Sequence, residues 1–89
     1  MFIILIYDIS IKSDYQVKVL NMCRQYLFHI QDSCFHGYIS FKNYNELLKK
    51  LNKIISVDDH IIIYKLSSDK YLKVEELGQH KVKKSIIVE

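Results

Sequence analysis

The chain has 89 residues, of which 49 % are hydrophobic, and its formal net charge is +3 at pH 7. A core of this size is marginal, because only about 60 to 65 % of the unfolded chain's surface is buried on folding. Cys23 and Cys34 are too few and too far apart for a disulfide framework or a CxxC motif. The opening apolar run is far shorter than the roughly 20 residues that span a bilayer, so we expect a cytoplasmic protein without a membrane segment.

We interpret residues 1–89 as one domain. The chain has no proline, only Gly37 and Gly78, and no low-complexity stretch that would mark a linker. Its apolar content exceeds what one small core readily hides, which favours self-association. The positive charge comes from twelve lysines and a single arginine, Arg24. Because reading base edges usually requires arginine, we expect any nucleic-acid contact to be with backbone phosphates.

An uninterrupted apolar run, Phe2 to Tyr7, opens the chain and ends directly on Asp8. A strand that is apolar on both faces is typically central and covered on both sides. Pleating puts Asp8 on the same side as Ile4 and Ile6, at the rim of one apolar layer. This carboxylate either shapes the following turn or holds a cation, and the residue taken alone favours the turn.

A helix and a second strand are expected next. Ser13 with Gln16 resembles a capping box, and a helix to about residue 28 is predicted by apolar residues at helical spacing: Val17, Leu20, Cys23 and Leu27. The segment 31–41 is rich in aromatic and apolar residues and contains Gly37. It predicts one strand with a bend or bulge.

A second helix and further strands complete the chain. Asn43 with Glu46 offers another capping pattern, and the helix after it carries an apolar stripe of Leu47, Leu48, Leu51, Ile54 and Ile55. The segment 60–66 predicts a strand that is apolar on both faces, and residues 86–88 predict a short terminal strand. Residues 71–77 fit either a strand or a helical turn, and we interpret them as a strand or edge segment.

The element order predicts a ferredoxin-like α+β sandwich, βαββαβ with an extra C-terminal strand. In this fold two helices cover one face of an antiparallel sheet and leave the other face open. The strands are nevertheless apolar on both sides. The same face of a second copy is the economical cover, so we expect a homodimer formed through the sheet faces.

Two motifs strengthen this interpretation: Tyr7-Asp8-Ile9-Ser10 at the end of the first strand, and Gln31-Asp32-Ser33-Cys34-Phe35-His36-Gly37 in the second. Together with the segment Val74-Glu75-Glu76-Leu77-Gly78, they resemble the small CRISPR-associated endonuclease family. Its members are homodimers that pair with the CRISPR integrase during spacer acquisition. The similarity extends over nearly the whole chain, and the order and spacing of the motifs are more specific than either motif alone.

The resemblance implies a homodimer in which the terminal strand of each protomer joins the sheet of the other. It implies that Asp8 binds a divalent ion, Mg²⁺ or Mn²⁺, and that the two Asp8 residues approach across the interface. The implied activity is cleavage of RNA or DNA in antiviral defence. The implied partners are the integrase, and RNA or double-stranded DNA through its phosphates. Ser33 and Phe35 match family positions next to the active site, whereas His36 stands where relatives often have an acid.

Two other functions stay open. The chain could be a non-catalytic scaffold between integrase subunits, which would fit His29 standing where relatives carry a basic residue. It could also be an RNA-recognition module, because the run from His36 to Phe41 faintly resembles the aromatic strand of such modules. The four histidines show no HxxxH spacing, so we expect no zinc site.

Overall fold

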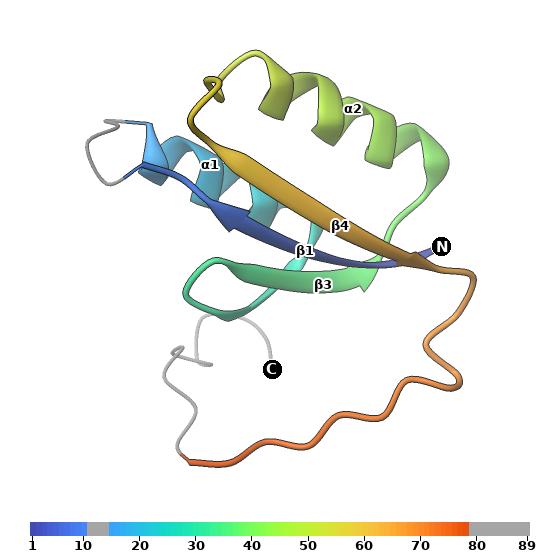
Figure 1. Ribbon diagram of the computed structural model, residues 1–89. Helices are drawn as coiled ribbons and strands as arrows, with labels where there is room; N and C mark the ends of the chain where they lie inside the picture. Colours follow the sequence, from blue (N-terminus) through green and yellow to red (C-terminus); the bar gives the residue numbers. More distant parts are fainter. Residues whose placement is uncertain (11–14, 79–89) are drawn as a thin grey trace.

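The computed structural model describes residues 1–10 and 15–78. In chain order its elements are β1 (Phe2–Asp8), α1 (Gln16–Tyr26), β2 (Phe28–Gln31), β3 (Cys34–Tyr38), α2 (Phe41–Asn52) and β4 (His60–Leu66). The strands form one sheet in the order β2-β3-β1-β4 with antiparallel neighbours, and both helices lie on one side of it (Figure 1). The ferredoxin-like α+β sandwich is therefore confirmed. The expected strand at residues 86–88 lies outside the described residues.

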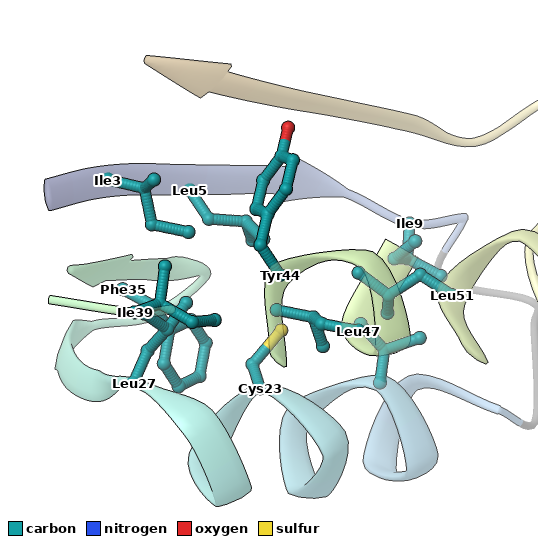
Figure 2. Packing of buried hydrophobic residues seen from close by; sticks show 11 residues of the cluster. Ile3, Leu5, Ile9, Cys23, Leu27, Phe35, Ile39, Tyr44, Leu47 and Leu51 are labelled. Carbon is teal, nitrogen blue, oxygen red and sulfur yellow. The ribbon is translucent and has the colours of Figure 1, made fainter. Parts of the chain in front are cut away.

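The hydrophobic core lies between the sheet and the two helices (Figure 2). Ile3 and Leu5 of β1 are fully buried and point towards the helices, as the alternation of a strand requires. They meet a set of buried side chains from β3, α1 and α2: Phe35, Val19, Cys23, Tyr44, Leu47 and Leu51. Val17, which the periodicity placed in the apolar stripe, is 64 % exposed, so Val19 takes its place in the core.

The single bent strand expected over residues 31–41 is wrong. The segment forms part of a hairpin, in which β2 ends at Gln31 and β3 begins at Cys34. Asp32 makes the turn with a φ of 39°, a left-handed conformation that a short polar side chain tolerates. Gly37 does not bend β3, but its φ of 154° suits glycine, and it is buried against Leu27 and Phe28.

The N-terminal caps of both helices differ from the expected ones. Residue 15 precedes α1 without capping it through its side chain, and Ser13 lies outside the described residues. The cap of α2 is Ser40 rather than Asn43, because the Asn43 amide donates to the Ser40 hydroxyl at 3.1 Å. Phe41 is consequently the first residue of α2, so the run from His36 to Phe41 is no continuous aromatic strand. The RNA-recognition interpretation loses its main support.

The segment after β4 forms neither helix nor strand up to Gly78, so the strand expected at residues 71–77 is wrong within the described chain. The segment runs from the end of β4 past β3 on the side away from the helices (Figure 1). Leu77 and Val74 of this segment are exposed, at 99 % and 65 %, whereas Leu72 is half-buried. Near its start, Asp69 is tied to β3, because the Asp69 amide donates to the Tyr38 hydroxyl at 3.1 Å and that hydroxyl donates to the Asp69 carboxylate.

Candidate functional site

The sheet face opposite the helices is apolar, and no helix or strand of residues 1–10 and 15–78 covers it; we call it the open face. The strand register puts onto this face Phe2, Ile4, Ile6 and Asp8 of β1, Cys34, His36 and Tyr38 of β3, and His60, Ile62 and Tyr64 of β4. Ile62, Ile6, Tyr64 and Tyr38 are 36 to 56 % exposed, whereas Ile4 and His36 are half-buried. Only Phe2 is buried there, because the rings of His36 and Tyr38 contact it edge-on at centroid distances of 5.5 and 5.1 Å.

The imidazole of His36 lies on the open face and does not add a positive charge to it. Burial lowers the pKa of His36 from its usual value, against a smaller opposing effect of Asp69. The side chain is therefore neutral at pH 7. Among the described residues, carboxylates lie at both ends of this face, with Asp69 bonded to Tyr38 at one end and Asp8 at the other.

Asp8 is the last residue of β1 and is exposed. Its direct partner across the strand pair is His60, the first residue of β4, which is exposed too. None of the described residues accepts or donates a side-chain hydrogen bond at the Asp8 carboxylate. The carboxylate therefore stands at the edge of an apolar surface, next to an imidazole, as the sequence placed it.

The segment after Asp8 is held by Asp59, in the loop between α2 and β4. The Asp59 carboxylate accepts hydrogen bonds from the Ser10 amide at 3.0 Å, the Ser56 amide at 2.8 Å and the Tyr15 hydroxyl. The Ser56 amide contributes most, followed by Tyr15, and together they lower the pKa of Asp59 to about 2. The side-chain amide of Gln16 also donates a hydrogen bond to the Ser10 carbonyl, at 2.9 Å.

The two neighbours implied by the resemblance have different places. Ser33 lies in the β2–β3 turn, and its carbonyl accepts from the Tyr7 amide at 3.0 Å, which puts the turn at the Asp8 end of β1. Phe35 is fully buried on the helix side of the sheet, where its ring stacks on His29 at 4.5 Å and on Tyr7 at 6.1 Å. Contact between Phe35 and a substrate at Asp8 does not fit this placement, because the two side chains lie on opposite faces.

The only arginine, Arg24, reaches His29, the position at which the family resemblance implied a basic residue. Arg24, in the last turn of α1, donates to His29 Nδ1 at 3.4 Å, and His29 Nε2 donates to the Asp32 carbonyl at 2.6 Å. These contacts were not foreseen, because their partners become adjacent only when α1 and the hairpin pack together.

The donor chemistry at Asp8 fits a hard divalent cation, because a carboxylate oxygen is the ligand that such ions prefer. One protomer is not sufficient, however. Within residues 1–10 and 15–78 no three histidine, cysteine, aspartate or glutamate side chains gather into a group that could hold a metal ion. A metal at Asp8 therefore needs ligands from a second copy, from substrate or from water.

The architecture and the site define a class: a ferredoxin-like domain with an uncovered apolar sheet face and a carboxylate at the end of its central strand. The model of the family "CRISPR associated protein Cas2" matches residues 1–74, so the chain belongs to this family. It is 34 % identical over 82 residues to the CRISPR-associated endoribonuclease Cas2 of Fusobacterium nucleatum, covering 88 % of this chain and 77 % of that one. It is 30 % identical to the Methanosarcina acetivorans protein of the same name, over 99 % and 100 % of the two chains.

Solved structures agree with this assignment. A Cas2 crystal structure superposes with a TM-score of 0.83 at 28 % identity, over 99 % of this chain and 98 % of that one. Streptococcus pyogenes Cas2 gives a TM-score of 0.74 at 25 % identity, over 88 % and 100 %. In the part of the chain that the structure describes, neither helix has the length and apolar character needed to cross a membrane.

Proposed function

We propose that this chain is a divalent-metal-dependent endonuclease, with Asp8 as its metal ligand, that also serves as a subunit of the CRISPR spacer-acquisition complex. The observation that carries the proposal is the exposed Asp8 carboxylate at the end of a central strand, on the edge of an uncovered apolar face. Relatives named CRISPR-associated endoribonuclease Cas2 support the nuclease part. The integrase as partner and Mg²⁺ or Mn²⁺ as the ion follow from the family resemblance.

The active form is a homodimer in which two open faces meet. Such contact removes Ile6, Ile62 and Tyr64 from water, and these side chains are 36 to 52 % exposed in the single chain. It also brings two Asp8 carboxylates towards each other, and their mutual repulsion is relieved by a hard cation. Light scattering of dilute protein tests this assembly, and a stable mass near 10.6 kDa would contradict it.

A divalent ion at Asp8 would polarise a phosphodiester and make bound water a better nucleophile. The protein's own contribution is to hold the ligand in place. Hydrogen bonds from Ser10 to Asp59 and from Tyr7 to Ser33 fix the backbone on both sides of Asp8. RNA or double-stranded DNA is bound mainly through its phosphates by lysines, which provide point charges without base readout.

The deciding experiment compares wild type with Asp8→Asn in Mg²⁺-dependent cleavage of RNA and of double-stranded DNA. The substitution keeps the size and one side-chain oxygen but removes the charge that the cation needs. Asp58→Asn is the matched control, because Asp58 is an exposed acid in the α2–β4 loop. We expect cleavage to be lost in Asp8→Asn alone. Equal metal-dependent cleavage by Asp8→Asn and wild type would contradict the proposal.

A non-catalytic scaffold is the second candidate, and a groove between α1 and α2 favours it. The groove is lined by Lys18, Lys50 and Lys53, by the amides of Asn21 and Gln25, and by Met22 and Ile54. No carboxylate lines it, so it suits the phosphates of a bridged duplex. If neither wild type nor Asp8→Asn cleaves, duplex binding that is weakened by Lys18→Glu with Lys53→Glu would support the scaffold.

A further inference from the structure

We propose that His60 is a second metal ligand beside Asp8, so that each protomer offers a carboxylate oxygen and an imidazole nitrogen to one ion. The inference rests on the proposed metal site at Asp8. It adds a nitrogen donor, which alters which divalent ion the site prefers. Asp8 and His60 are the last pair of the β1–β4 ladder. Residues directly opposite in an antiparallel pair share a face, with Cβ atoms about 4.5 to 5.5 Å apart. Rotation of the two side chains is sufficient to bring both donors to one ion at about 2 Å.

Both side chains are free to turn towards an ion. Asp8 and His60 are exposed, and no described residue forms a side-chain hydrogen bond with the Asp8 carboxylate or the His60 ring. The pair lies at the end of the open face, beyond Ile6 and Ile62. An ion held there would be shielded on one side by apolar side chains and accessible to a phosphate on the other.

The backbone around the pair is held by one residue. Asp59 directly precedes His60, and its carboxylate accepts from the amide of Ser10, two residues after Asp8. The further bonds from Tyr15 and Ser56 fix the Asp59 carboxylate itself. The two ligand-bearing residues are therefore held together before any ion binds, which reduces the cost of ordering them.

A second copy completes the site. A single chain offers two donors, and no third ligating side chain joins them among the described residues. Contact between two open faces brings a second Asp8 and a second His60 to the same end of the interface. The resulting set of nitrogen and oxygen donors suits Mn²⁺ and later transition metals better than Mg²⁺, which prefers oxygen and retains its water.

The test measures Mn²⁺ and Mg²⁺ binding to the intact dimer by calorimetry, for wild type, His60→Gln, Asp8→Asn and the control Asp58→Asn. We expect His60→Gln to weaken Mn²⁺ binding at least about tenfold and to change Mg²⁺ binding less than about twofold, because only Mn²⁺ gains from the imidazole. Asp8→Asn should weaken both ions, and Asp58→Asn neither. Unchanged Mn²⁺ affinity in His60→Gln, with binding lost in Asp8→Asn, would overturn the role of His60 and leave the proposed function standing. Binding that is unaffected by Asp8→Asn would overturn the metal site itself.

A spectroscopic measurement on the wild type covers the case in which His60→Gln disturbs the dimer. Electron spin-echo spectroscopy of bound Mn²⁺ detects a directly coordinated nitrogen. We expect nitrogen modulation in wild type and in Asp58→Asn. Its absence in a wild-type dimer that binds Mn²⁺ would overturn the proposal.

Discussion

Substitution of Phe35 is the sharpest test of whether a residue implied by the family resemblance has a structural or a catalytic role. Its ring is fully buried and stacks on His29 and Tyr7, on the side of the sheet away from Asp8. Phe35→Ala removes the ring and leaves a cavity, which costs about 3 to 5 kcal/mol in protein cores. Because a whole domain is stable by only about 5 to 15 kcal/mol, this variant is close to unfolding. Phe35→Leu keeps part of the buried apolar volume and should therefore cost less than Phe35→Ala.

Urea unfolding followed by circular dichroism at fixed protein concentration measures both variants. A loss of about 3 kcal/mol at an m-value of about 1 to 1.5 kcal/mol/M lowers the midpoint by about 2 to 3 M. Phe41→Ala is the matched control, because Phe41 is an aromatic residue that is 74 % exposed at the start of α2. A loss below about 1 kcal/mol in Phe35→Ala would refute the core role. Abolished cleavage by a stable Phe35→Leu would show that the ring contacts the substrate.

Three further predictions concern acid stability, thiol reactivity and salt. Since the pKa of Asp59 is lowered to about 2, its stabilising effect is present above pH 4 and is lost as the pH falls towards 2; the difference in melting temperature between wild type and Asp59→Asn should shrink over that range. Burial raises the pKa of Cys23 to about 12, so this thiol should react with a thiol reagent at pH 8 only at the rate of unfolding, and rapid labelling of the native protein would contradict its burial. Duplex affinity should fall steeply with salt and differ little between sequences, and a preference above about a hundredfold for one sequence would exclude backbone-directed binding.

The sequence alone determined the type and order of most elements and the place of Asp8. Apolar residues that recur every two positions in a strand, or every 3.6 in a helix, show which side of the element is apolar. This is a local property of the sequence. The strand that is apolar on both faces up to Asp8 therefore predicted both a central position and a carboxylate at its rim. The same reasoning failed at the hairpin, because a turn at Asp32 depends on one left-handed residue that no periodicity marks.

Only the tertiary structure decided what surrounds Asp8. The bond between the Ser10 amide and Asp59 joins residues 49 positions apart, and the pairing of Asp8 with His60 follows from the register of two strands that are distant in sequence. The structure also decided that Phe35 points into the core while Asp8 lies on the open face. Register and facing depend on the packing of the whole sheet against both helices, and a shift of one residue would exchange the two faces of a strand. Local sequence patterns carry no information about partners at that distance, so the site around Asp8 became visible only in the folded chain.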